Sequence, residues 1–207
     1  MMLGSAGVKI LSYVTATYSA TGTTTPHTFS GVSLGAESGT RRVIVGIAAG
    51  EPGGTVGAIT GVTIGGVSAT QITTSAQTEV SIDLWIALVP SGTTGDVVVS
   101  FSGSINQLGL SVWNSRGLLS NTPIDTGTSL ADPSTDTLST VNGGFCVAVM
   151  VTDSAAGNIS WTNVTERFES AMISEEHSGG DATTTGANIS PSGDASAGNC
   201  AGVFVTF

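Results

Sequence analysis

The sequence carries little charge, and positive charge is the scarcest. Only 10% of its 207 residues are charged, and a single lysine, Lys9, accompanies four arginines. Globular proteins usually carry about 25% charged residues, and helical surfaces are built largely from Lys, Arg, Glu and Gln, so the shortage disfavours helices. The net charge of −10, with Arg41-Arg42 as the only basic pair, also argues against binding to a nucleic-acid backbone.

Cysteine and long apolar runs are scarce as well. The two cysteines, Cys146 and Cys200, lie in separate apolar runs, which favours buried free thiols over a disulfide. No apolar run approaches the roughly 18 residues of a membrane span, and the stretch 10–20 is too polar for the core of a signal peptide. We therefore expect no membrane insertion and no cleaved secretion signal.

What the chain does contain is a repeated pattern of β-prone runs and turn residues. The clearest example is SIDLWIALVPSGTTGDVVVSFS at 81–102, where apolar runs at 82–89 and 97–101 flank a connector at 90–96. This pattern predicts a hairpin of two strands. Because 29 glycines and the same alternation extend along the chain, we expect an all-β fold, an antiparallel two-sheet β-sandwich of the jelly-roll or Greek-key type.

A weak internal repeat divides the chain near its middle. Residues 21–49 run from a Thr/Gly-rich loop through a polar strand to an apolar strand, and residues 124–152 follow the same succession. We expect a flexible segment at 1–7 and a single sandwich domain at 8–207, which the repeat would divide into similar halves at 8–118 and 119–207. The alternative is that any Thr/Gly-rich β protein resembles itself. The continuous apolar run 144–152 should lie in the middle of a sheet.

Residues suited to catalysis are few. The segment GVSLG at 31–35 matches the nucleophile-elbow pattern, but a turn sequence follows it where the mechanism needs a helix. Only His27 and His177 are available as bases, and no second histidine stands at metal-ligand spacing from His177. Glycoside hydrolysis needs two facing carboxylates, which the sequence does not pair among Asp153, Glu166, Glu169, Glu175 and Glu176. We expect a protein that is not an enzyme and needs no cofactor.

One loop is rich in aspartate. Asp125, Asp132 and Asp136 lie close together along the chain. Carboxylate and carbonyl oxygens of such loops can ligate calcium, so these three residues form a candidate metal site. The loop lacks an EF-hand pattern, and aspartate is also an ordinary turn residue.

The three tryptophans divide into two kinds. Trp85 and Trp113 lie in apolar runs, which predicts that both pack in the core. Trp161 has polar neighbours and is the best candidate for an exposed aromatic ligand contact. We therefore expect any ligand groove to lie around Trp161, Asn158, Asn163 and Asp181.

The segment LWIALVPSGTTGDVVVSFSG, with GVTIGGVSATQI before it and LGLSVWNSRGL after it, resembles a pattern of known proteins, as do NGGFCVAVMVTD and the terminal AGVFVTF. The pattern is similar to β-rich jelly-roll virion proteins of tailed bacteriophages and phage-like gene transfer agents. The resemblance covers most of the chain and implies a head decoration, spike, fibre or tail appendage. It transfers no catalytic residue.

This resemblance implies a non-enzymatic structural protein on the virion surface, assembled in the host cytoplasm. Its expected partners are other virion subunits, capsid or tail, and further copies of the same chain. The apolar residues Met1, Met2 and Leu3 are candidate subunit contacts. The alternative function is a carbohydrate-binding module of a head or tail appendage that contacts a host-surface glycan.

Overall fold

Four antiparallel sheets make up the protein. The computed structural model describes residues 9–19, 24–154, 158–195 and 198–207, and every regular element in these ranges is a β-strand. The strands form two sheets of five, one of four and one of three, and all pairs between named strands are antiparallel. The prediction of an all-β antiparallel fold is confirmed, but with four sheets in place of the expected two.

The first half of the chain forms one large and one smaller sheet. The large one, called inner sheet 1, has the order β1 (Ile10–Ser19), β9 (Gln107–Arg116), β3 (Arg42–Gly50), β7 (Val80–Leu88) and β6 (Thr70–Ala76). The smaller one, outer sheet 1, has the order β2 (His27–Ser33), β8 (Thr94–Ser102), β4 (Ala58–Ile64) and β5 (Val67–Ser68).

The second half repeats this strand order with shorter outer strands. Inner sheet 2 has the order β10 (Asp125–Ser129), β17 (Cys200–Thr206), β12 (Asn142–Thr152), β15 (Glu176–Thr185) and β14 (Thr165–Ala171). Outer sheet 2 has the order β11 (Ser134–Thr135), β16 (Ser192–Asp194) and β13 (Ser160–Thr162). The strands at equivalent positions of the two inner sheets are β1 and β10, β3 and β12, β7 and β15, and β9 and β17.

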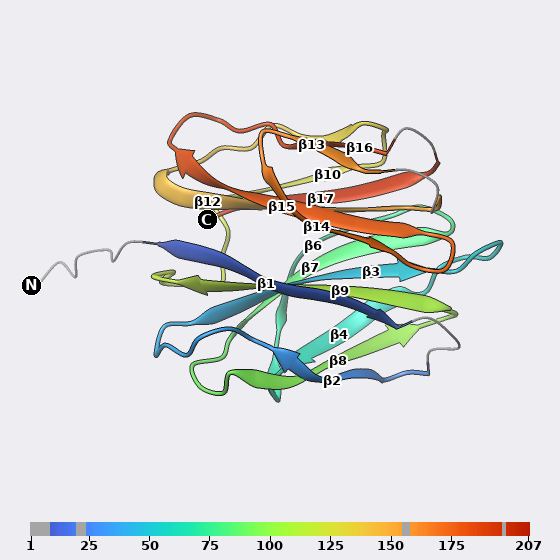
Figure 1. Cartoon of the computed structure of the whole chain (residues 1–207), viewed down its shortest axis with the longest axis horizontal. Helices are drawn as coiled ribbons and strands as arrows, with labels where there is room; N and C mark the ends of the chain where they lie inside the picture. Colours follow the sequence, from blue (N-terminus) through green and yellow to red (C-terminus); the bar gives the residue numbers. More distant parts are fainter. Residues whose placement is uncertain (1–8, 20–23, 155–157, 196–197) are drawn as a thin grey trace, which may run out of the picture.

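The four sheets stack as layers, with the two inner sheets face to face in the middle (Figure 1). One apolar cluster fills the space between outer sheet 1 and inner sheet 1, and includes Val45, Ile47 and Val99. A second lies between the inner sheets and joins the halves, with Ile82 and Leu84 against Val147 and Val149. Two smaller clusters lie between inner sheet 2 and outer sheet 2.

The central strands explain this layering. β3 and β12 are buried along almost their whole length, because each inner sheet is covered on both faces and both faces must be apolar. The run 144–152 lies on β12 in the middle of its sheet, as predicted. Trp85 and Trp113 are buried, also as predicted. Cys146 and Cys200 are buried free thiols at opposite ends of the β12–β17 pairing.

The predicted hairpin at 81–102 is wrong. β7 pairs with β3 and β6 in inner sheet 1, whereas β8 pairs with β2 and β4 in outer sheet 1. The connector after β7 therefore crosses from one layer to the other as an arch. Local β propensity and turn residues predict strands and a reversal of direction, but they do not distinguish a hairpin from an arch.

A buried arginine holds this arch. Arg41 is fully buried and donates to the carbonyl oxygens of Val89 at 2.6 Å, Ser91 at 2.9 Å and Gly92 at 2.7 Å. It also donates to the Gly35 carbonyl at 2.8 Å. The planar guanidinium has five N–H donors, so a single side chain satisfies a loop whose own carbonyls have no strand partner.

The hairpins β6–β7 and β14–β15 correspond in detail. Each closes with a four-residue turn, 77–80 or 172–175, in which the first N–H donates to the last carbonyl at 2.8 Å. Each also has a register shift at the same distance from its turn, at 71–73 and at 166–168. The backbones of the two hairpins are therefore equivalent residue by residue.

This register assigns counterparts between the halves. On the face of each hairpin turned toward its outer sheet, the residues of the first half and their counterparts in the second are Gln71 and Glu166, Thr74 and Glu169, Ser81 and Glu176, and Asp83 and Ser178.

Candidate functional site

The residues predicted to surround a ligand groove do not meet. Trp161 is half-buried between inner sheet 2 and outer sheet 2, and its Nε1–H donates to the Ser178 hydroxyl at 2.8 Å. Asn158 and Asn163 are exposed, and the Asn163 amide donates to the Ser190 carbonyl at 2.7 Å. Trp161 therefore packs in a small core where an exposed contact was expected.

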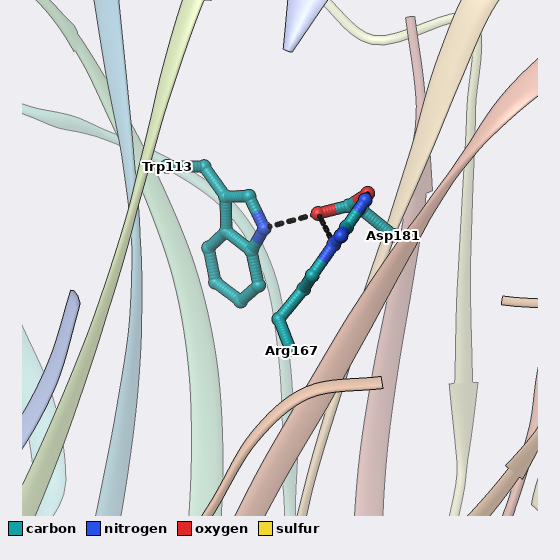
Figure 2. Close-up of polar contacts among 3 residues, drawn as sticks. All are labelled: Trp113, Arg167 and Asp181. Atoms are coloured by element: carbon teal, nitrogen blue, oxygen red, sulfur yellow. Dashed lines mark hydrogen bonds and ion pairs between the residues drawn. The ribbon is translucent and has the colours of Figure 1, made fainter. Parts of the chain in front are cut away.

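Asp181, the fourth residue of that set, lies on the other face of inner sheet 2, between the two halves. Its carboxylate accepts from Trp113 Nε1 at 2.9 Å and from Arg167 Nε and Nη2 at 2.9 and 2.7 Å (Figure 2). Asp181 is 7% exposed and Trp113 is fully buried. The carboxylate thus neutralises a bidentate arginine and satisfies an indole of the opposite half, which is a structural use of its charge.

The candidate metal residues each bind nearby backbone. Asp125 accepts from the N–H groups of Thr126 at 2.9 Å and Ser139 at 2.8 Å, and the bond from Ser139 is the main cause of its lowered pKa. Asp132 accepts from Ala195 N–H at 3.0 Å, and Asp136 accepts from its neighbour Thr137 at 2.7 Å.

No three acidic, histidine or cysteine side chains gather as a metal-binding group within the ranges that the structure describes. The predicted subunit contacts Met1, Met2 and Leu3 lie outside those ranges.

The nucleophile-elbow segment and the histidines lie apart. Ser33 is exposed at the end of β2, and His27 begins the same strand, about 20 Å away along an extended chain. His177 is fully buried between the inner sheets, where its ring packs edge-on against Phe168 with 4.8 Å between centroids. Burial lowers the pKa of His177 to about 3, so the ring is neutral at physiological pH.

Two of the glutamates considered for hydrolysis touch each other. Burial, followed by the charge of Glu169 and a hydrogen bond with it, raises the pKa of Glu176 to about 7. Two carboxylates in contact cannot both ionise readily, so Glu176 keeps its proton to higher pH than a free glutamate does. Glu169 also accepts from the Ile159 N–H at 2.5 Å. This contact leaves no space between the carboxylates for a sugar ring, which hydrolysis requires.

A cleft that sequence reasoning missed lies in the first half. β5 borders β4 only at Thr63 and Ile64, so the first residues of β4 form a margin of outer sheet 1. Between this margin and the hairpin β6–β7 opens a cleft of about 310 Å³, here called the Asp83 cleft. Its polar lining comes mainly from the hairpin, through Gln71, Thr74, Ser81 and Asp83. Its apolar lining comes from Val56, Ala58 and Ile59.

Two buried polar groups of β7 line the Asp83 cleft. Asp83 is 2% exposed and accepts from Gln71 Nε2 at 2.7 Å. Burial raises the pKa of Asp83 to about 6, although hydrogen bonds from Gln71, Thr74 and Trp85 act in the opposite direction. Ser81 is 3% exposed, and its hydroxyl has no hydrogen-bond partner among the described residues. A buried carboxylate with a raised pKa beside an unpaired hydroxyl in a cleft is typical of a binding site.

A sequence signal for this cleft did exist. Asp83 is the one charged residue in the apolar run 82–89, and a charge in a buried strand needs a reason. The strand pattern predicts that Ser81 and Asp83 share a face, but it does not predict that a sheet margin leaves that face uncovered.

Comparison of the chain with protein-family models, with curated proteins and with solved structures finds no match. Among the described residues there is no helix of the length and apolarity needed to cross a bilayer.

Proposed function

We propose that the protein is a non-enzymatic structural subunit of a phage virion, a surface decoration, spike or fibre component that docks on other virion subunits and associates with copies of itself. In this proposal each half is a jelly roll. The observation that carries the proposal is the uncharged edge strand β1.

The pairing of early strands with late ones supports the jelly-roll assignment. β1 pairs with β9 and β2 with β8 in the first half, and β10 pairs with β17 and β11 with β16 in the second. Winding the chain as two Greek keys brings its first and last strands together in this way, and viral capsid and lectin domains use this fold. The step from fold to virion rests on that analogy and on the resemblance of the sequence.

β1 supports self-association. This strand has ten residues, ILSYVTATYS, none of them charged and none a proline. It is an edge of inner sheet 1, and Ile10 and Tyr18 are 49% and 47% exposed. An edge of this length presents unpaired backbone N–H and C=O groups, which a strand of another chain can pair with.

The other edges of the inner sheets are protected. β14 carries Glu166, Arg167 and Glu169, and charged edges resist pairing. β6 and β10 lie against each other, and the Ser75 hydroxyl donates to the Ser129 carbonyl at 3.3 Å. β1 also contacts β14, where the rings of Tyr13 and Phe168 stack with 5.8 Å between centroids. The length of β1 and its lack of charge are therefore what support it as the assembly edge.

Analytical ultracentrifugation tests this assignment. The wild-type chain should form a defined oligomer at about 10 μM, which corresponds to roughly −7 to −8 kcal/mol of association free energy. The double variant Ser12→Lys/Thr17→Lys places two charges on exposed positions of β1 and should weaken association at least tenfold. Mass spectrometry of particles released by cells that encode the chain should detect it as a component.

A matched control carries the same added charge elsewhere. Thr94→Lys/Ser102→Lys places two lysines on exposed positions of β8, which lies between β2 and β4 in outer sheet 1. This variant should associate like the wild type. A monomeric wild-type protein, or equal loss of association in both variants, would refute β1 as the assembly edge.

A further inference from the structure

The Asp83 cleft has polar groups that the folded chain does not fully use. The buried Ser81 hydroxyl lacks a partner among the described residues. Beside it, the buried Asp83 carboxylate accepts from Gln71 on Oδ1, and Thr74 and Trp85 also act on it. Burial of such groups costs free energy unless they are paired. A ligand that forms hydrogen bonds with these groups would offset this cost.

The second half indicates what size of group fits over this face of the hairpin. There, Ser178 stands at the position of Asp83, and the indole of Trp161 lies against it with an N–H···O bond of 2.8 Å. Gly193 makes room for that ring, since a Cβ there would lie 3.1 Å from Trp161. In the first half the same face is an open cleft of about 310 Å³, at the lower end of the size of ligand sites. A single ring with donor groups is the matching occupant.

The lining selects the chemistry of that ring. Gln71, Thr74, Ser81 and Asp83 present carboxamide, hydroxyl and carboxylate groups, and the opposite margin presents the small aliphatic side chains of 56–59. Among the described residues of this lining Asp83 carries the only charge, which disfavours phosphates and other anions. A sugar ring has the complementary character, with hydroxyl donors on its rim and an apolar C–H face.

We propose that the Asp83 cleft binds a single neutral pyranose, the terminal sugar of a glycan, with its hydroxyls on Asp83, Gln71 and Ser81 and its C–H face on the 56–59 margin. This site is distinct from the residues around Trp161 and does not depend on assembly through β1. It gives the protein a ligand-binding activity beyond a structural role.

Ligand-observed saturation-transfer NMR with the full chain tests the site. The probes are the methyl glycosides of glucose, galactose, mannose, rhamnose and N-acetylglucosamine at up to about 10 mM, the range expected for one ring in an open cleft. At least one should bind to the wild type. Asp83→Asn keeps the shape of the side chain but removes the charge, and should weaken binding at least tenfold, because hydrogen bonds to a carboxylate are the strong ones.

Two further variants and one further probe complete the test. Thr74→Trp places a ring on the cleft face of the hairpin, opposite Asp83, and should abolish binding, whereas Asp136→Asn in the second half should bind like the wild type. Circular dichroism verifies that each variant is folded. Binding of no glycoside, or undiminished binding by both cleft variants, would overturn the proposal. Binding of ethanolamine in preference to the glycosides would overturn the choice of a neutral sugar.

Discussion

The two halves have the same order of strands but different interiors. In the first half, long strands of outer sheet 1 cover inner sheet 1 through one large apolar cluster. In the second half, outer strands of two or three residues leave two small clusters, which Trp161 bridges. Strand order therefore depends on backbone pairing and turns, while the covering of each inner sheet depends on particular side chains.

The hairpins β6–β7 and β14–β15 show this difference most clearly. They share their turn and register shift, yet the face toward the outer sheet carries Gln71, Thr74, Ser81 and Asp83 in one and Glu166, Glu169, Glu176 and Ser178 in the other. Each face holds a carboxyl group with a raised pKa, about 6 for Asp83 and about 7 for Glu176. Asp83 lines an open cleft, whereas Glu176 is hydrogen-bonded to a second glutamate, Glu169.

The largest expected effect concerns the arches that join inner and outer sheets. Arg41→Met removes the four strong donors under the first arch and leaves its buried carbonyls without partners. We expect a loss of about 3–5 kcal/mol in the free energy of unfolding, as for other broken buried charge networks. Urea denaturation followed by tryptophan fluorescence measures it.

The connector 186–191, which joins β15 of inner sheet 2 to β16 of outer sheet 2, is a second arch and provides the control. There, the Thr140 hydroxyl donates to the Ala187 carbonyl at 2.7 Å in an exposed setting. Thr140→Val should cost at most about 1 kcal/mol, because water replaces the lost bond. Equal losses in the two variants would mean that the arches are held in the same way, contrary to this comparison.

The next effect concerns the ring of Trp161. Trp161→Ala removes a half-buried indole from the interior of the second half and its bond to Ser178, and should cost about 2–4 kcal/mol. Trp161→Phe keeps most of the packing and loses the N–H bond, so it should cost about 1 kcal/mol. Thermal and urea unfolding of both variants give these values. A loss below about 1 kcal/mol for Trp161→Ala would show that the ring is not what fills the second half.

The sequence pattern predicted where strands occur, but it did not predict which strands pair with each other. The apolar run 144–152 predicted a central strand because continuous apolar residues require cover on both faces, and β12 has it. The hairpin prediction at 81–102 was wrong because a connector of turn residues reverses the chain equally well within a sheet or between layers. The arch depends on Arg41, whose carbonyl partners lie up to 51 positions away in the chain.

The candidate site was harder to predict for the same reason. Polar neighbours along the chain made Trp161 look exposed, but β15 supplies Ser178 from 17 positions away to pair with its N–H. Asp181 looked like a surface residue, yet its partner Trp113 belongs to the other half, 68 positions away. The Asp83 cleft needs the margin of β4 and the hairpin β6–β7 together, which only the fold brings into contact.

The smallest effect compares the two raised carboxyl groups through pH. Since the folded protein raises the pKa of Asp83 from 3.8 to about 6, the folded state holds a proton that the unfolded state releases between these values. The contribution of Asp83 to stability is therefore most favourable below about pH 4 and falls as pH rises toward about 6, with a cost of about 1–3 kcal/mol above that. Asp83→Asn should remove this cost, so the variant should exceed the wild type in stability at pH 7 and match it at pH 4.

Glu176→Gln should also be more stable than the wild type at higher pH. The difference should develop at higher pH than for Asp83→Asn, because the pKa of Glu176 is raised from 4.5 to about 7. Its gain at neutral pH should be of similar size, because the two pKa values are raised by similar amounts. Urea titrations of both variants at pH 4, 5, 6 and 7, as differences from the wild type, distinguish the two carboxyl groups. Identical pH profiles for the two variants would mean that the two carboxyl groups have equivalent surroundings, contrary to the difference described between the two hairpin faces.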